Sequence, residues 1–364
     1  MAVDANQRKF APVFVLGSPR SGTTLLYDVL LSSGGFAVYL AESNVFNVLG
    51  PRFGNFGSRE TRKQVLNAWS NSKLFRATGL SSADIEKRIL EDCRNTGDFL
   101  RIVMDEMVRA QGMQRWAENS PEGLLHLPAI KQQIPSALIL HIIRDGRDVA
   151  MSLGKLKYVR PLPWEKRQSL LGAGAYWEWM VEHGRRYGSL FGSDYHEIHF
   201  EDLVSSPQQT LNEIGRFLDH DLDYERIRRV GYGSVSKPNT SFSAESPNAG
   251  HSPVGRWKKG FSPQQLAKFE RMIGPTLRKL GYETSVSPPD RGMGLGLATT
   301  RQFHRIFFEA KQMFKRSSLI RAFRPTLTAA EIDATMLAED HPPRPYREEE
   351  AATSLHTTSP GMSK

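Results

Sequence analysis

The stretch that most constrains the fold is VFVLGSPRSGTTLLYDVLL, residues 13–31. Its first five residues form a short apolar run, which is typical of a strand buried on both faces of a parallel sheet. A small-residue loop then leads into an apolar-periodic segment at 23–31, which predicts a helix. Gly17 permits a tight exit from the strand, and Gly22 lets backbone N–H groups approach an anion at the helix N-terminus. The stretch therefore predicts a strand, an anion-binding loop and a helix.

The rest of the chain repeats this alternation of strands and helices. Apolar runs predict further strands at 36–40, 137–143 and 196–200. Helices are expected over most of 59–116, from about 148, around 175–187, at 207–218 and at 263–280. Strands that alternate with helices predict an α/β protein with a P-loop-like three-layer fold, in which helices flank a central parallel sheet.

The character of the chain changes after about residue 285. Residues 1–284 are expected to form the α/β domain, and 285–364 a linker, a basic amphipathic helix and a disordered tail. Residues 301–324 contain seven Lys and Arg side chains against the single acid Glu309, with apolar residues at helical spacing. Such a helix predicts either peripheral contact with an anionic membrane surface or docking on the domain or on a second subunit of a homodimer.

Composition limits the class of protein. The formal net charge is +9 and the pI is about 9.6, which favours an anionic partner. Cys93 is the only cysteine, so intrachain disulfides and cysteine-rich metal sites are excluded. No apolar run approaches the ~18 residues of a membrane span, and the N-terminus lacks the pattern of a signal peptide. We therefore expect a cytoplasmic protein.

The anion-binding loop differs from that of nucleotide triphosphatases, which spell G-x-x-x-x-G-K-[ST]. Here Thr23 and Thr24 follow Gly22, and the nearby cation is Arg20. A triphosphatase also needs a carboxylate for Mg²⁺ after a later strand, but the run ALILHII is followed by Arg144. The loop therefore favours anion binding without a metal over a kinase or ATPase.

A second anion site is expected where the strand at 137–143 ends. Arg144 begins the sequence RDGRDVAMS, which ends at Ser152 in the following helix. In open α/β sheets, ligands bind at this carboxyl edge, where a guanidinium and a hydroxyl suit a phosphate group. Nucleic-acid binding is disfavoured, since these cations lie at two separate loops and are not interleaved with aromatic residues.

Three motifs in this order resemble the sulfotransferases that use 3′-phosphoadenosine 5′-phosphosulfate (PAPS): PRSGTT, the Arg…Ser pair and the later GRWKK. The form with Arg in the loop is similar to the bacterial, tyrosylprotein and carbohydrate-type branch. The resemblance implies that the loop holds the 5′-phosphosulfate through Ser18, Pro19, Arg20, Ser21, Gly22, Thr23 and Thr24. It implies that Arg144 and Ser152 hold the 3′-phosphate, and that the nucleotide is closed in by Gly255, Arg256, Trp257 and Lys258.

The resemblance also implies a catalytic pair. Glu42 follows Arg20 by 22 residues, where this branch places its general base, and Arg20 would neutralise the leaving phosphate. Many relatives have a lysine where this chain has Asn119, which leaves open what stabilises the transferred group. His126, in an H-L-P context, is the alternative base.

The acceptor cannot be predicted from these motifs. The resemblance implies a hydroxyl or amine on a small molecule, carbohydrate, lipid or peptide, and the reaction is expected to need no metal. Two further possibilities stay open at this point: a sulfotransferase-like protein that binds the nucleotide without turnover, and a P-loop kinase or NTPase.

Overall fold

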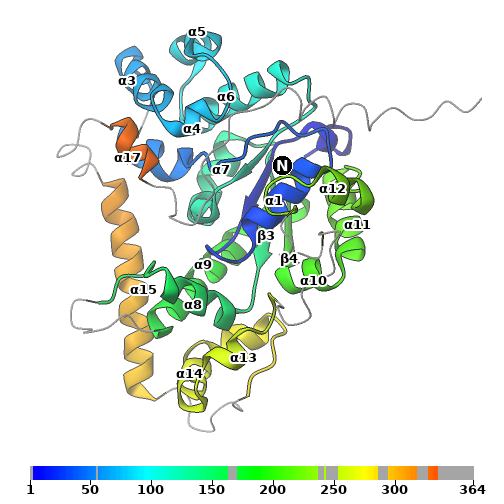
Figure 1. The fold of residues 1–364 in the computed structure, drawn as a ribbon. Coiled ribbons are helices and arrows are strands. Elements are labelled where there is room, and N and C mark those ends of the chain that lie inside the picture. Colours follow the sequence, from blue (N-terminus) through cyan, green and yellow to red (C-terminus); the bar gives the residue numbers. More distant parts are fainter. Residues whose placement is uncertain are drawn as a thin grey trace, which may run out of the picture.

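The computed structural model describes residues 3–54, 56–162, 170–236, 242, 253–285, 294–317 and 327–334. Its centre is a four-stranded parallel sheet in the order β2-β1-β3-β4 (Figure 1). The strands are β1 (Val13–Leu16), β2 (Ala117–Asn119), β3 (Leu138–Ile143) and β4 (Tyr195–His199). The predicted α/β architecture is confirmed.

Successive residues of each strand point to opposite faces, and helices cover both faces. On one face, Val13 and Val15 belong to an apolar cluster with α1 (Thr23–Ser32) and α11 (Pro207–Leu218). On the other face, Phe14 and Leu16 belong to a cluster that includes α9 (Leu170–Gly188). The sheet is therefore the middle layer of three.

Further helices complete these outer layers. Those between β1 and β3 are η2 (Val45–Leu49), α2 (Gly50–Phe53), α3 (Arg59–Ser70), α4 (Lys73–Arg76), α5 (Ser82–Asp92), α6 (Thr96–Ala110), η3 (Pro121–His126) and α7 (Leu127–Gln133). The others are η1 (Ala5–Phe10), α8 (Gly146–Lys155), η4 (Ser189–Asp194), α10 (Phe200–Ser205), α12 (Tyr224–Val230), α13 (Trp257–Gly260), α14 (Pro263–Lys279), α15 (Leu295–Arg316) and α17 (Ala329–Asp333).

The strand predicted at 36–40 is wrong. Phe36 forms a single bridge with Arg115, and the segment continues without a ladder. The Gln111 side chain accepts a hydrogen bond from the Val38 N–H at 2.7 Å and donates to the Val38 carbonyl at 3.1 Å. A side-chain amide thus replaces a neighbouring strand here. The edge position of the sheet is taken by β2, a three-residue strand that the apolar pattern did not predict.

The basic helix predicted at 301–324 is present as α15, which begins earlier, at Leu295, and ends at Arg316. It lies against α9, where Arg301 pairs with Glu178 at 2.5 Å and Arg305 with Glu182 at 2.8 Å. Most of the predicted tail lies outside the described residues. None of the described helices is both long enough and apolar enough to cross a membrane.

Candidate active site

The carboxyl ends of the four parallel strands meet at one edge of the sheet, and the predicted motifs lie there. The loop of Gly17 to Gly22 follows β1, Ser120 follows β2, Arg144 follows β3 and Phe200 follows β4. These segments lead directly into α1, η3, α8 and α10, whose N-termini therefore point toward the same edge. This is the edge at which open α/β sheets bind ligands.

The two loop glycines are required by close approaches. A Cβ atom on Gly17 would lie 2.6 Å from the Ile142 carbonyl oxygen, and one on Gly22 would collide with the Phe200 ring. Gly22 also has a φ of +98°, in the region that favours glycine. Gly22 is the N-cap of α1 and supplies no side-chain cap. The first N–H groups of α1 are thus left to another acceptor.

The interior of the loop offers hydroxyl groups to an anion. The Ser18 and Ser21 side chains are fully buried, and their Oγ atoms have no hydrogen-bond partner among the described residues. Thr23 is buried and Thr24 is exposed in the first turn of α1, which contains no acidic residue. Buried hydroxyls without partners are rare, so these residues fit a bound phosphate or phosphosulfate.

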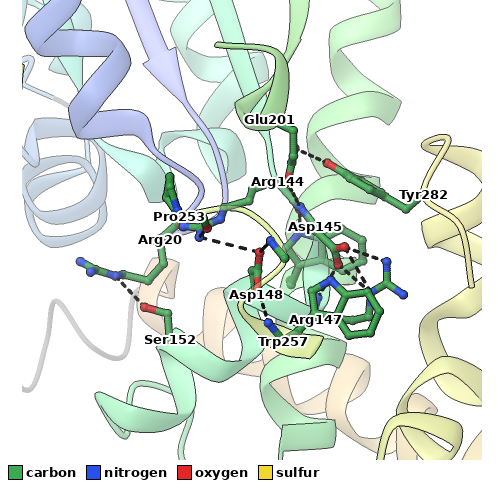
Figure 2. Close-up of polar contacts among 12 residues, drawn as sticks. Arg20, Arg144, Asp145, Arg147, Asp148, Ser152, Glu201, Pro253, Trp257 and Tyr282 are labelled. Carbon is green, nitrogen blue, oxygen red and sulfur yellow. Dashed lines mark hydrogen bonds and ion pairs between the residues drawn. The ribbon is translucent and has the colours of Figure 1, made fainter. Parts of the chain in front are cut away.

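Arg20 is held in an unusual backbone conformation. Its φ is +73°, one of the few positive values at a non-glycine residue in the described chain. Such a conformation costs about 1–3 kcal/mol and is concentrated at functional sites. The Arg20 Nε donates to the Ser152 Oγ at 3.1 Å, as Figure 2 shows. The strained loop thus directs the Arg20 guanidinium toward α8.

Arg144 joins three segments that are distant in sequence (Figure 2). It donates to the Arg20 carbonyl at 3.1 Å and to the Pro253 carbonyl at 2.6 Å, and its guanidinium lies 4.4 Å from the centre of the Phe200 ring. Burial lowers the pKa of Arg144. The negative charge of Asp148, at a distance of 3.9 Å, partly offsets this by raising it. The Arg144 Nε has no hydrogen-bond partner in the described chain. Arg144 is therefore both a structural link and a donor still available to a phosphate.

Asp148 was not among the predicted site residues, although it lies in the same motif. Its carboxylate accepts hydrogen bonds from the Gly255 N–H at 2.9 Å and the Trp257 N–H at 2.8 Å. The segment with Gly255, Arg256, Trp257 and Lys258 is thereby attached to the N-terminal half of α8. An acid one helical turn after Arg144, inside an anion-binding motif, was the signal that could have revealed this role.

The other arginine of the motif has a different task. Arg147 binds Asp145 through two nitrogens and Glu270 of α14 at 2.6 Å, and it lies 3.8 Å from the centre of the Trp257 ring. Arg147 is thus occupied by acids and by the indole. The Asp145 N–H donates to Glu201 at 2.9 Å, and Glu201 also accepts from Tyr282.

The closing segment leaves its cations at the surface. Trp257 is buried, whereas Arg256 and Lys258 are exposed. The Lys258 Nζ lies 5.8 Å from the centre of the Trp257 ring. The indole is therefore an anchor in this structure, and the two cations are the groups that remain accessible beside it.

Glu42 lies in the loop before η2 and is half-buried. The next residue, Ser43, donates to the buried carboxylate of Glu118 at 2.6 Å, and the Asn44 N–H donates to the Ser120 Oγ at 3.3 Å. These bonds attach the Glu42 loop to the end of β2, at the carboxyl edge of the sheet. Glu118, whose pKa is raised by burial, was not predicted as part of the site.

The neighbourhood of Glu42 contains a polar cluster that the sequence did not indicate. The Tyr158 and Tyr176 hydroxyls each donate to Glu122 at 2.9 Å, and Lys315 of α15 approaches Glu122 at 3.9 Å. Burial is the main cause that raises the pKa of Tyr158, and the negative charges of Glu122 and Glu42 raise it further. Glu42 therefore acts electrostatically on the loop after α8, the helix that carries Ser152.

Asn119 ends β2, opposite Val15 in the register. It is buried, and its Oδ1 has no hydrogen-bond partner among the described residues. This amide, which stands where the resemblance implies a lysine, is thus next to the strand from which the loop of Gly17 to Gly22 departs. This oxygen is an acceptor, so it suits a hydrogen-bond donor, whereas the Nδ2 group of the same amide is the part that can donate to an anion.

His126, the alternative base, has its contacts with η2 and α15. It precedes α7, contacts the Phe46 ring and lies 3.5 Å from Arg316. Together with His183 and Tyr187 it lines a cavity of about 400 Å³. Burial lowers its pKa to about 3, which makes it a weak base near neutral pH.

Comparisons with known proteins agree with this geometry. Residues 12–224 match the model of the Sulfotransferase family. The chain is 23% identical over 294 residues to a putative protein-tyrosine sulfotransferase of Caenorhabditis briggsae, covering 77% of this chain and 92% of that protein. It is 28% identical over 175 residues to mouse sulfotransferase 1B1, covering 38% and 55%.

A solved structure shows the same fold. The sulfotransferase domain from the curacin biosynthetic pathway superposes with a TM-score of 0.50 at 17% identity, covering 75% of this chain and 98% of that domain.

Among the described residues, no group of three or more His, Cys, Asp or Glu side chains is arranged to hold a metal ion.

Proposed function

Since the chain belongs to the sulfotransferase family, we propose that it transfers a sulfuryl group from PAPS to a hydroxyl or amine of an acceptor. One observation carries this proposal. Arg20, Arg144 and Ser152 come from motifs more than 120 positions apart, yet the Arg20 side chain bonds Ser152 and the Arg144 side chain bonds the Arg20 backbone. The two motifs that we propose to bind anions are thus in contact with each other at the sheet edge, which supports a single site.

In this proposal the β1–α1 loop holds the 5′-phosphosulfate, through the N–H groups at the start of α1 and the hydroxyls of Ser18, Ser21, Thr23 and Thr24. Arg144 and Ser152 hold the 3′-phosphate, with Arg256 and Lys258 as accessible cations beside Trp257. When bound, PAPS supplies the sulfuryl group and leaves as adenosine 3′,5′-bisphosphate. Arg20 supplies positive charge where the leaving phosphate gains negative charge.

Glu42 is the proposed general base. It takes the proton of the acceptor hydroxyl or amine as that group attacks sulfur in line. The bonds of Ser43 to Glu118 and of Asn44 to Ser120 support this assignment, because they hold the Glu42 loop at the same sheet edge as the anion-binding loop. Asn119 would donate its amide N–H groups to oxygens of the transferred group.

We propose the acceptor as a chemical class: it has a hydroxyl or amine on a small molecule, carbohydrate, lipid or peptide. The named relatives include a putative protein-tyrosine sulfotransferase, so a phenol is one member of this class to test. A binder without turnover is the second candidate, and the observation that favours it is the uncharged Asn119 next to the anion-binding loop.

Titration calorimetry tests the nucleotide half of the proposal. We expect adenosine 3′,5′-bisphosphate to bind with a micromolar Kd in the presence of EDTA, and ATP to bind much more weakly with or without Mg²⁺. A preference for Mg-ATP would overturn the proposal. Sulfuryl transfer from ³⁵S-labelled PAPS to a panel of phenols, sugars and amines then separates an enzyme from a binder.

A further inference from the structure

The outward side of α15 exposes an unusual amount of apolar surface. Of the seven large apolar side chains exposed in the described chain, five lie on this helix, and the other two are Phe10 and Leu190. We call these five the outer face: Leu295 (88% exposed), Phe303 (46%), Ile306 (53%), Met313 (72%) and Phe314 (58%). Contiguous apolar patches on a surface mark sites of interaction, whereas scattered single residues do not.

The outer face is a single side of the helix. At 3.6 residues per turn, its five residues fall within about 100° of arc. The opposite side is docked, since His304 and Phe308 are buried there; Glu309, on the flank between the two sides, accepts a hydrogen bond from Trp179 of α9 at 2.7 Å. Figure 1 shows α15 at the left margin of the molecule. The helix thus has one side that packs on the domain and another that faces away from it.

Charge on α15 is unevenly distributed. Arg301 and Arg305 pair with acids of α9, on the docked side. The last six residues, 311–316, contain three cations: Lys311, Lys315, which approaches Glu122 at 3.9 Å, and Arg316, which donates to the Leu125 carbonyl at 2.7 Å. Lys311 is exposed and forms no ion pair at salt-bridge distance within the described residues, although the charge of Glu122 acts on it. The C-terminal third of the helix therefore combines apolar side chains with positive charge at the surface.

We propose that the outer face lies in the interface of an anionic lipid bilayer, with the exposed Lys311 beside it at the headgroups. Helices with an apolar side bordered by Lys and Arg bind such surfaces through apolar burial and electrostatic attraction together. A second copy of this chain is a poorer occupant: the outer face contains no acid, and Glu309 is already bonded to Trp179. The overall charge of +9 favours an anionic surface as well. This proposal does not depend on the sulfuryl-transfer reaction.

Vesicle co-sedimentation of the full chain tests this proposal. The vesicles are phosphatidylcholine alone, or phosphatidylcholine with phosphatidylglycerol as the anionic lipid. We expect binding to the anionic vesicles that weakens as salt is added. The double variant Met313→Gln and Phe314→Gln, which keeps good helix formers, should lower the partition coefficient about tenfold or more, since two exposed apolar side chains are lost.

Phe10→Gln is the matched control, because Phe10 is equally exposed but lies on η1. It should bind anionic vesicles like the parent, and all variants should keep the parent melting temperature. Absence of vesicle binding by the parent, or equal binding by the double variant, would overturn the proposal. Sedimentation velocity tests the rival occupant, a second copy of the chain. If the parent is a dimer and the double variant is a monomer, the outer face is a dimer interface.

Discussion

The carboxyl edge of the sheet has two parts that are built differently: the part proposed to bind the nucleotide, around Arg20 and Arg144, and the part proposed to bind the acceptor, around Glu42. On the nucleotide side, each motif contacts the others through its own residues: Arg20 meets Ser152, Arg144 meets Pro253, and Asp148 holds Gly255. On the acceptor side, Glu42 belongs to no such motif. Its loop is attached by Ser43 and Asn44 to β2, and its neighbours come from η3, the loop after α8 and α15.

This difference has a consequence for specificity. The nucleotide side is made of short segments whose residues are proposed to bind phosphate, a ligand with fixed geometry. The acceptor side is made of single residues contributed by several helices, among them α15, which lies beyond the residues that match the family. We infer that substitutions on the two sides separate experimentally: nucleotide affinity should change on one side and turnover on the other.

The largest expected effect tests the acceptor side. Glu42→Gln removes the proposed base but keeps the size of the side chain, so kcat should fall about 10²- to 10⁴-fold. The Kd for adenosine 3′,5′-bisphosphate should be unchanged, because Glu42 is not in the nucleotide motifs. Single-turnover transfer from PAPS and calorimetry measure the two quantities. An active Glu42→Gln variant would show that another group takes the proton.

The next effect compares the two arginines of RDGRD. Arg144→Lys should weaken bisphosphate binding about 10- to 100-fold, because an ammonium cannot reproduce the planar donor set of a guanidinium. Arg147→Lys should instead lower the free energy of unfolding by about 1.5–3 kcal/mol, since it loses charge-assisted bonds to Asp145 and Glu270. Calorimetry and urea unfolding distinguish the variants, and equal losses of affinity would remove the distinction we draw between them.

A third, smaller effect tests the attachment of the closing segment. Asp148→Asn offers one carbonyl oxygen where the carboxylate accepts two N–H groups, so the bisphosphate Kd should rise about tenfold. Asp92→Asn, an exposed acid at the end of α5, is the matched control and should bind like the parent. If Asp148→Asn also binds like the parent, the Gly255 segment does not depend on this carboxylate.

The positioning of the Glu42 loop gives a fourth prediction. Glu118→Gln and Ser43→Ala should each lower kcat about fivefold without changing the bisphosphate Kd, because they weaken one bond that holds the loop. The double variant should lose no more than the larger single loss, as expected for two partners in one contact. Additive losses would mean that the two residues act separately.

The last prediction concerns neither side and leaves activity and nucleotide affinity unchanged. His141 of β3 is fully buried, donates to or accepts from the Tyr195 hydroxyl at 2.6 Å, and has its pKa lowered to about 3 by burial. Below pH 6.5 the unfolded chain binds a proton that the folded chain does not, so stability falls as pH falls. At pH 5.5 this costs about 1.4 kcal/mol. His141→Gln should flatten the dependence of urea stability on pH between 7 and 5.5, with bisphosphate affinity unaffected.

The sequence predicted local elements well and long-range partners less well. β1, β3 and β4 and the helices α1, α8, α11 and α14 follow from apolar runs, periodicity and turn residues. The segment 36–40 has a strand-like composition, but Gln111 satisfies its backbone, and no local pattern carries that information. β2 is too short to give a period, and only its pairing with β1 defines it as a strand.

The same distinction applies to the site. The sequence by itself determined that the two motifs proposed to bind phosphate lie at the ends of parallel strands, because glycine geometry, helix N-termini and the order of strands are local properties. Only the tertiary structure decided that Arg147 is bound by acids while Arg144 keeps a free Nε, and that Asp148 holds the closing segment. Which ion pairs form depends on which side chains become buried together, and that depends on the whole packed chain.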